Sequence, residues 1–377
     1  MKRSGSRALR PTQLGMSLIE TMVGITLGLV VVLVLTQVWG NFEGQKQRSI
    51  SGSTAQESGV IALTQIEQDA RSAGAGLSNS ALDCTNVFSY FEVGATTVSP
   101  VPSYSGAAPM APARIVDGGA LSDQITFKRG DDIAGGIPVT LAASMSNSSA
   151  VIDVPSVAGF NDGDVALVMG SGGNCTVLQI TQVMVPALKI QHNPGGAATF
   201  NPPTSYRDAN GWPAYASGSK VMKVGRIETR MYSVNANNQM SLLDETNPVA
   251  SVTSILAHDI VRLKAQYGIA DAGTQDVNAW VNATAVGGWD ALDPVKIKRI
   301  KAIRVAIIAR SAKLESGNVT GTCTNNAGVN NGPCAWPDTA ANPAPLIDLS
   351  ADPNWRRYRY RVYQTVIPLR NVIWGAV

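Results

Sequence analysis

The amino-acid sequence predicts an α+β fold, in which a long N-terminal α-helix packs on an antiparallel β-sheet with an enlarged β-rich insertion. Two observations support this prediction. An apolar run at residues 16–39 continues, without proline, into an amphipathic stretch that ends near residue 76. Beyond it, the chain changes to short β-branched runs bounded by Gly, Asn and Asp, which is typical of strands. The chain is therefore expected to begin as one helix and to continue as sheet.

Residues 1–15 form a basic leader. They contain Lys2, Arg3, Arg7 and Arg10 and no acidic residue. The whole chain has a formal net charge of +3, so the remainder has a charge of −1, with 26 basic against 27 acidic residues. The basic balance therefore belongs to the leader and gives no argument for nucleic-acid binding. It agrees with the positive-inside rule, which keeps such a segment in the cytoplasm.

Residues 16–39 are long enough to cross a membrane as a helix, because about 20 apolar residues span a hydrocarbon core of ~30 Å. Glu20 is the only charged residue in this run. A charge inside a membrane helix costs about 2.5–3.5 kcal/mol on insertion scales, so Glu20 is predicted to be functional. The alternative is a plain signal anchor whose helix dipole favours an acidic residue near its start. Gly24 and Gly28 form a GxxxG pattern that permits close helix packing, although membrane helices also contain glycine for other reasons.

Residues 40–76 are predicted to be an amphipathic continuation of the same helix. Small or apolar residues recur there every three to four positions, which is the spacing of one helix face. Glu67 and Arg71 form an i,i+4 pair on the other face. The helix should end at the glycines of residues 74–76. The predicted buried stripe consists of Ala55, Gly59, Ala62, Ile66, Ala70 and Ala73.

The rest of the chain is divided into a β-rich region at residues 77–220 and a β-sheet region at 221–377, which includes a disulfide loop and the C-terminal strand. Residues 185–220, which are rich in Pro, Gly and Asn, are predicted to form a long surface loop. Two further loops are predicted at 272–294 and 313–353. The predicted strands are 124–128, 150–154, 165–169, 176–183, 221–234, 240–243, 261–267, 303–309 and 358–369.

The four cysteines are Cys84, Cys175, Cys323 and Cys334. An even number in an exported chain suggests disulfides, and four cysteines allow three pairings. We favour Cys323–Cys334, because a local bridge would hold the turn-rich segment between them. That choice leaves Cys84–Cys175, which would tie the end of the long helix to the first β-region. Zinc is not expected, because the chain has no CxxC motif and only two histidines.

Residues 11–20, PTQLGMSLIE, resemble the leader of type IV pilins and type II secretion pseudopilins. The resemblance implies that a prepilin peptidase cuts between Gly15 and Met16 and methylates the new amine of Met16, while the apolar segment is kept. An ordinary secretory signal is instead cut after its apolar region. The resemblance also implies that Glu20 accepts an ion pair from the methylated amine of a neighbouring subunit. Many pilins have a proline at the position of Gln37, so the bending of this helix is not specified.

The later part of the chain resembles the PilW-type minor pilins. The matching blocks are scattered but in order, behind a pilin-like leader. They are GFNDGDVALV, LQITQV, RLKAQYGIA at 262–270, IRVAIIARSA at 303–312 and YRVYQTVIPLRN at 360–371. J-type pseudopilins resemble PilW-type proteins, so the alternative function is a J-type pseudopilin of a type II secretion system. Members of that group tend to be shorter than this chain.

What the resemblance implies is a structural role in interaction. The chain would be a minor pilin that primes assembly of a type IV pilus and sits in a tip complex, presenting an adhesin. Its partners would be the prepilin peptidase, other minor pilins and the major pilin. It would be held in the inner membrane by a single span, with its globular part in the periplasm, and would reach the pilus tip after assembly. No cofactor and no nucleic acid are expected.

No catalytic constellation emerges from the residues, so we expect no enzyme. His192 and His258 have no nearby nucleophile, and both are expected to be solvated or structurally bonded. A membrane-anchored exported hydrolase remains the alternative of a different class. Two further ligands are compatible with the residue types. Calcium could be bound by Asp162, Asp164, Asp244 and Glu245, and DNA by Arg357, Arg359 and Arg361, which alternate with Tyr358, Tyr360 and Val362. Turns and a two-faced strand explain these residues without a ligand.

Overall fold

The structure, a computed structural model, describes residues 17–131, 137–146, 151–195 and 198–374. The leader, with Gly15 and Met16, lies outside the described residues, so the cleavage site stays a prediction. The chain divides into two compact units, Met1–Ser51 and Gly52–Val377. From Leu18 on, the described residues of the first unit belong to one helix, and all described strands belong to the second unit.

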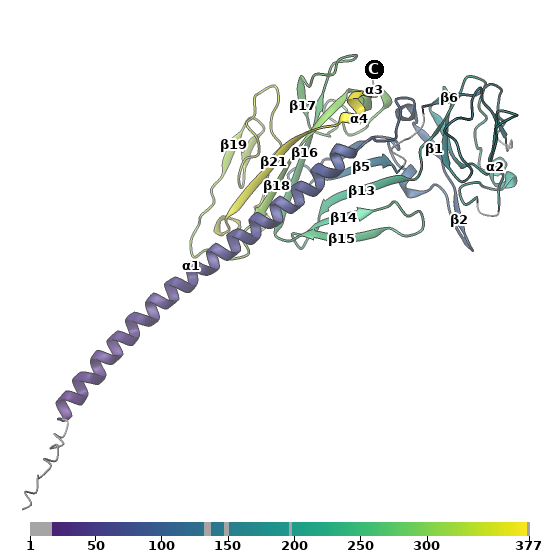
Figure 1. The fold of residues 1–377 in the computed structure, drawn as a ribbon. Helices are drawn as coiled ribbons and strands as arrows, with labels where there is room; N and C mark the ends of the chain where they lie inside the picture. Colours follow the sequence, from purple (N-terminus) through teal and green to yellow (C-terminus); the bar gives the residue numbers. More distant parts are fainter. Residues whose placement is uncertain (1–16, 132–136, 147–150, 196–197, 375–377) are drawn as a thin grey trace, which may run out of the picture. The chain divides into compact units, whose positions relative to one another are not determined.

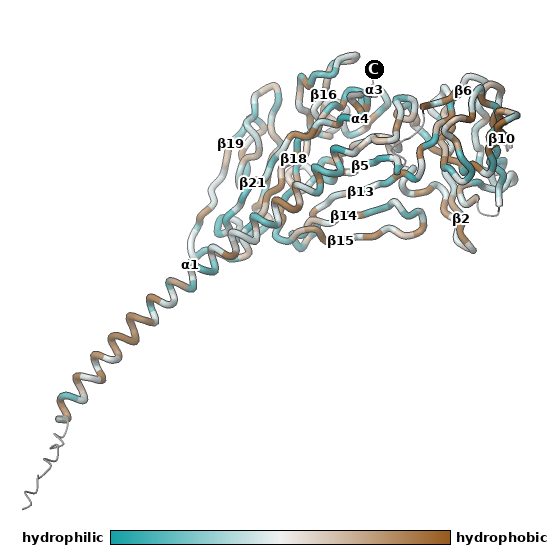
Figure 2. Tube along the Cα trace, viewed as in Figure 1, coloured by the Kyte–Doolittle hydropathy of each residue, from teal (hydrophilic) through white to brown (hydrophobic). Residues whose placement is uncertain are grey.

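Helix α1 (Leu18–Ser72) is the longest element of the chain. Its apolar N-terminal part is exposed, and it is the mostly brown stretch of the helix in Figure 2. By length and composition, α1 is the one helix in the described part of the chain that could cross a membrane. The helix ends where predicted, because Gly74 and Gly76 have φ values of +80° and +72°, which glycine adopts without strain.

Two antiparallel sheets pack against the second half of α1 (Figure 1). Their strand orders are β15-β14-β13-β5-β4 and β17-β16-β18-β21. Residues of α1 and of both sheets share one core, which includes Ile66, Tyr232 and Ile303. The strands are β4 (Ala113–Val116), β5 (Gln124–Gly130), β13 (Ile227–Val234), β14 (Met240–Asp244), β15 (Val252–Ala257), β16 (Ile260–Ile269), β17 (Ala279–Val281), β18 (Ile300–Arg310) and β21 (Tyr360–Pro368).

The remaining larger sheets form a β-rich part with two cores of its own. Their orders are β1-β9-β8-β12-β6 and β10-β11-β7, and only β1 with β9 runs parallel among the described pairs. All five residues of β8 are buried, because both faces of this central strand are covered. These strands are β1 (Asn86–Phe88), β6 (Val139–Thr140), β7 (Val151–Asp153), β8 (Val165–Met169), β9 (Asn174–Gln179), β10 (Gln182–Met184), β11 (Lys189–Gln191) and β12 (Lys220–Lys223).

Strand β18 is also buried on both faces. Ile303, Val305 and Ile307 face the core shared with α1, while Ala306 and Ile308 join a core on the opposite face. That second core is closed by the segment before β21. The other elements are β2 (Phe91–Val93), β3 (Thr96–Val98), β19 (Cys323–Asn325), β20 (Gly328–Asn330), α2 (Thr204–Ala209), α3 (Pro294–Arg299), α4 (Arg370–Trp374), η1 (Ala81–Asp83), η2 (Pro102–Tyr104) and η3 (Trp355–Arg357).

The prediction of one long surface loop at 185–220 is wrong. The segment contains β11 and α2, and it is fastened to the sheet by a buried amide. Asn201 Oδ1 accepts a hydrogen bond from Gln179 N at 2.7 Å, and Asn201 Nδ2 donates to Gln179 O at 2.7 Å. Pro and Gly correctly indicated turns, but composition cannot show which polar side chain is buried between them.

Two of the predicted strands are divided, and two of the predicted loops contain strands. The run 176–183 breaks between β9 and β10, and the run 221–234 breaks between β12 and β13 at Gly225. Residues 272–294 contain β17, and residues 313–353 contain β19 and β20. The C-terminal strand begins at Tyr360 rather than at 358, because η3 precedes it.

Candidate assembly helix and its anchorage

The first unit presents an uncovered apolar surface around α1. Among the described residues, all large apolar side chains from Leu18 to Phe42 are at least half exposed. A surface of this size is unfavourable in water and marks a region that lipid or other helices cover. Gly24 and Gly28 lie on this open part of the helix, where a Cβ would meet nothing within 4 Å.

Glu20 lies in the first turn of α1 and is exposed. The backbone N–H of Glu20 donates a hydrogen bond to Ser17 Oγ at 3.4 Å. The N-terminal end of a helix carries partial positive charge, so an acidic side chain is favoured there. Glu20 therefore stands as an exposed carboxylate at the start of an apolar helix, where a cation from outside the chain can reach it.

The second half of α1 is fixed to the sheets by the predicted stripe of small residues. Ala62, Ile66 and Ala70 are fully buried, and Ala55 and Ala73 nearly so. Small side chains allow the helix axis to approach the sheet closely, which buries the backbone as well as the side chains. The predicted pair on the outer face also forms, since Arg71 contacts Glu67. This surface pair contributes little to stability.

Asp69 is an ionisable residue on the buried face of α1, with a side chain that is 5% exposed. The hydroxyl of Tyr232 in β13 donates to Asp69, and Arg230 Nη1 lies 3.0 Å from Asp69 Oδ1. Burial and the neighbouring carboxylate raise the pKa of Tyr232, so the phenol stays protonated and remains a donor. The helix is thus held by a directional contact as well as by apolar packing.

The end of α1 is bound on two sides by backbone and amide contacts. Gly74 N donates to Lys128 O at 2.8 Å, and Gly130 N donates to Ala75 O at 2.8 Å. Asn371 Nδ2, next to the C-terminal strand, donates to Ala73 O at 3.0 Å. The carbonyls left open at a helix end are therefore partly satisfied by β5 and by the C-terminal segment.

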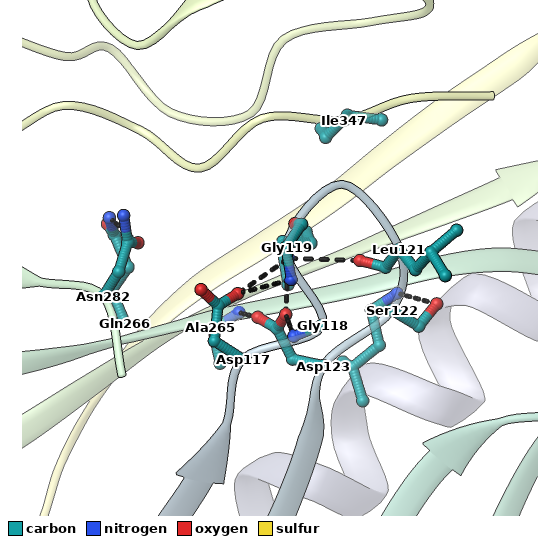
Figure 3. A network of polar contacts seen from close by, with 12 residues as sticks. Asp117, Gly118, Gly119, Leu121, Ser122, Asp123, Ala265, Gln266, Asn282 and Ile347 are labelled. Atoms are coloured by element: carbon teal, nitrogen blue, oxygen red, sulfur yellow. Dashed lines mark hydrogen bonds and ion pairs between the residues drawn. The ribbon is translucent and has the colours of Figure 1, made fainter. Parts of the chain in front are cut away.

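A buried ion pair joins β16 to Asp123, the residue before β5, and Figure 3 shows Asp123 among its contacts. Lys264 in β16 is fully buried, and its Nζ contacts the Asp123 carboxylate. It also donates to Gly119 O at 2.7 Å and to Leu121 O at 3.1 Å. Asp123 Oδ2 accepts from Ala265 N at 2.8 Å. Figure 3 shows the turn between β4 and β5 folded around these contacts.

The electrostatics of this ion pair follow from its burial. Burial raises the pKa of Asp123 to about 6, although Lys264 and two backbone N–H groups oppose the shift. At neutral pH Asp123 is therefore still a carboxylate and balances the buried ammonium. Nearby, Ile115 N donates to the Tyr267 hydroxyl at 2.5 Å, which closes the edge of β4 against β16.

Both disulfides are present in the pairing that the sequence favoured. Cys84 is bonded to Cys175, and Cys323 to Cys334, with Cα–Cα distances of 5.7 and 5.6 Å. The first links η1 to β9 in the β-rich part, and the second closes the β19–β20 hairpin. Structural disulfides persist in oxidising compartments, which is consistent with export.

The acidic residues that could bind calcium have contacts within the chain. Within the described ranges, no three His, Cys, Asp or Glu side chains form a group that could hold a metal ion. Asp164 pairs with Lys223 at 3.0 Å, and Asp244 lies 3.6 Å from Arg230. Asp162 accepts from a backbone N–H, and Glu245 N donates to Thr229 O.

The two histidines differ in environment. His258 is exposed and its Nδ1 lies 3.2 Å from Gln239 Nε2. His192 is buried beside Arg207, and burial followed by that neighbouring charge lowers the pKa of His192 to about 4. The imidazole is therefore neutral at pH 7, and it lies in the β-rich part with no nucleophile assembled around it.

The C-terminal arginines are bound within the chain rather than aligned on one strand face. Arg357 lies in η3 and its Nε donates to Glu315 O at 2.9 Å. Arg359 Nε donates to Glu315 Oε1 at 2.8 Å, and Arg361 lies 3.4 Å from Gln56 Oε1 on α1. The predicted alternation therefore holds only from residue 360, where Tyr360 and Val362 face the core opposite α1.

Residues 231–371 match the family described as Type IV Pilus-assembly protein W. This region is PilW-type. It contains the end of β13 and all of β14 to β21, and so supplies Tyr232 and Tyr363, which contact α1. No curated protein and no solved structure matches the chain. The later part of the chain is thus similar to a type IV pilus assembly family, as its sequence predicted.

The sequence analysis missed the residues that lock the helix in place. Asp69 was the available signal, because a carboxylate on an otherwise apolar helix face requires a buried partner. Nothing in the sequence identifies Tyr232 as that partner, since 163 positions separate the two residues. Lys264 in a β-branched run was a similar signal for Asp123.

Proposed function

We propose that this chain is a minor pilin that primes assembly of a type IV pilus and sits in a tip complex with other minor pilins, where it presents an adhesin. The observation that carries the proposal is the PilW-type region, which packs against the second half of a helix whose first half is apolar and uncovered. A helix of this kind is built to enter lipid first and a bundle of similar helices afterwards.

The proposal assigns roles to the N-terminal residues. Prepilin peptidase cleaves between Gly15 and Met16 and methylates the Met16 amine, and Glu20 then pairs with the amine of a neighbouring subunit. The exposed carboxylate in the first helical turn supports this assignment. Opposite charges attract far more strongly in a low-dielectric bundle than in water, and either charge alone is costly to bury. The pair therefore fixes the register between neighbouring subunits.

The same proposal fixes the location of the chain. Before assembly, α1 spans the inner membrane once, the basic leader stays in the cytoplasm and the globular part lies in the periplasm. The leader charge and the two disulfides support this orientation. After assembly, the chain reaches the pilus tip with the other minor pilins and the major pilin as neighbours.

A deletion strain, scored in parallel for sheared surface pilin and for secreted enzymes, tests the proposal. Loss of surface pili with normal secretion is the expected result. Pili at normal level with secretion lost would make the chain a J-type pseudopilin, which has the same leader and helix. Restoration by the full chain on a plasmid, and not by a chain lacking residues 1–15, controls for polar effects of the deletion.

A further inference from the structure

Strand β15 is an open sheet edge whose first four residues, 252–255, lack the usual protection. It forms one end of the order β15-β14-β13-β5-β4, and within the described chain no strand lies on its other side. Residues 251–257, SVTSILA, contain no charge, no proline and no glycine. Val252 is 59% exposed and Ile255 is 44% exposed. A long, uncharged and partly apolar edge invites pairing with another chain.

The other edges of the sheets under α1 are closed or blunted. The Tyr267 hydroxyl contacts both the N–H and the carbonyl of Ile115 in β4. The turn ending at Asp123 occupies the edge of β16 beyond the short strand β17, since Asp123 N donates to Leu263 O at 2.8 Å. Edge strand β21 contains Arg361 and Pro368. Charges, proline, β-bulges and covering turns are the usual ways to prevent edge pairing. Strand β15 has one of them, a register shift against β14 at Leu256, while its residues 252–255 have none.

We propose that β15 pairs with β15 of a second copy of this chain, antiparallel and about a two-fold axis. The N–H and C=O groups that an edge leaves to water recur at every second residue, and another extended strand matches that spacing. Pairing a segment with itself requires a self-complementary surface, and the absence of charge between residues 251 and 257 meets that need. The two five-stranded sheets would then become continuous.

The size of the contact fits chains held in a membrane. Six paired residues form a small interface, well below the roughly 1,000 Å² expected of a stable interface in solution. Anchoring raises the effective concentration of one copy near another, so a weak contact becomes populated. The inference rests on the proposed function only in taking α1 as a membrane anchor. The dimer is a state of the membrane-held chain and is scored without reference to pili.

Thiol cross-linking of the full chain in isolated membranes tests this pairing. The four native cysteines form two disulfides, so Ser254→Cys introduces the one reactive thiol. Thr97→Cys, an exposed position on the short strand β3, is the matched control. Two epitope-tagged forms made together show whether a cross-linked band contains two copies. A two-copy band from Ser254→Cys, and not from Thr97→Cys, is expected.

Charge variants in the same cross-linking assay give a second test of the pairing. In the Ser254→Cys chain, Thr253→Lys or Thr253→Glu alone should lower the two-copy band several-fold, and mixing the two variants should restore it, because opposite charges then meet across the edge. Equal bands from both cysteine positions, no band from Ser254→Cys in folded protein, or no restoration on mixing would overturn the pairing. A cross-link to a different protein in place of a second copy would also overturn it. Protease resistance of the globular part shows that each variant is folded.

Discussion

The ring of Tyr363 in β21 lies directly against Gly59 of α1. A Cβ at residue 59 would lie 2.2 Å from Tyr363 Cε2 and 2.3 Å from Cδ2, so the helix and the C-terminal strand approach as closely as a residue without a side chain allows. Tyr363 belongs to the PilW-type region, and Gly59 belongs to the long helix. Their contact sets the distance between the helix and its scaffold.

Gly59→Ala should therefore destabilise the globular part. Overpacking costs about 1–3 kcal/mol, against a gain of up to about 1 kcal/mol from replacing a helical glycine, so a net loss of about 1–2 kcal/mol is expected. Urea unfolding of the full chain in detergent, followed by tryptophan fluorescence, measures the effect. Gly52→Ala is the control, because a Cβ there meets nothing within 4 Å, and it should be neutral or stabilising. Equal effects of the two variants would show that the close approach is not limiting.

Asp123→Asn should be strongly destabilising. It leaves the Lys264 ammonium fully buried without its counter-charge, and breaking such a pair costs about 3–5 kcal/mol. The control is Asp117→Asn, because Asp117 is 3.5 Å from the same ammonium and partly exposed. Its loss should cost under about 1 kcal/mol. Comparable unfolding midpoints for the two variants would contradict the assignment of Asp123 as the main partner of Lys264.

His192 should make stability fall in acid. Its pKa is lowered to about 4 in the folded chain from 6.5, so the unfolded chain binds the extra proton between these values. The contribution of neutral His192 to the free energy of unfolding is fully present above pH 6.5. It falls by about 3 kcal/mol as the pH falls toward 4. Asp123, whose pKa is raised to about 6, changes stability in the opposite direction over an overlapping range.

The comparison of wild type with His192→Gln isolates the histidine, because Asp123 is common to both. Unfolding free energies at pH 7 and pH 4.5 should differ less in the variant than in wild type. An unchanged pH dependence would mean that His192 is not buried in the folded chain.

The two disulfides should contribute unequally. Cys84–Cys175 closes a loop with a sequence separation of 91, and Cys323–Cys334 closes one with a separation of 11. In the chain-entropy view, losing the long loop costs about 4–5 kcal/mol and losing the short loop about 3 kcal/mol. Paired Cys→Ser variants, compared by urea unfolding, measure the difference. A larger loss from the Cys323–Cys334 pair would show that the hairpin contributes more than loop closure.

The sequence predicted the helix and its buried face because these depend on local periodicity. Ala62, Ile66 and Ala70 recur at helical spacing, and the glycines at 74 and 76 are a local sequence signal for the end of the helix. It also predicted β8, whose five apolar residues can be covered only on both faces. The long-range contacts were not predictable, because nothing local in Tyr232 or Lys264 identifies Asp69 or Asp123 as its partner. The loop prediction for residues 185–220 was wrong for the same reason, because buried Asn201 gives the segment a fixed structure that its composition does not indicate.

The minor-pilin assignment depends most directly on whether the chain enters filaments through Glu20. The measurement is the amount of this chain in sheared pili, relative to major pilin, for wild type and for Glu20→Gln. Removal of the leader is followed in the same cells by the change in mass. Wild-type chain is expected in the sheared fraction, with normal leader removal in both strains. A strong reduction of Glu20→Gln in filaments is also expected, because the incoming amine would lack its counter-charge. Absence of the wild-type chain from sheared pili, or Glu20→Gln at wild-type level there, would contradict the assignment.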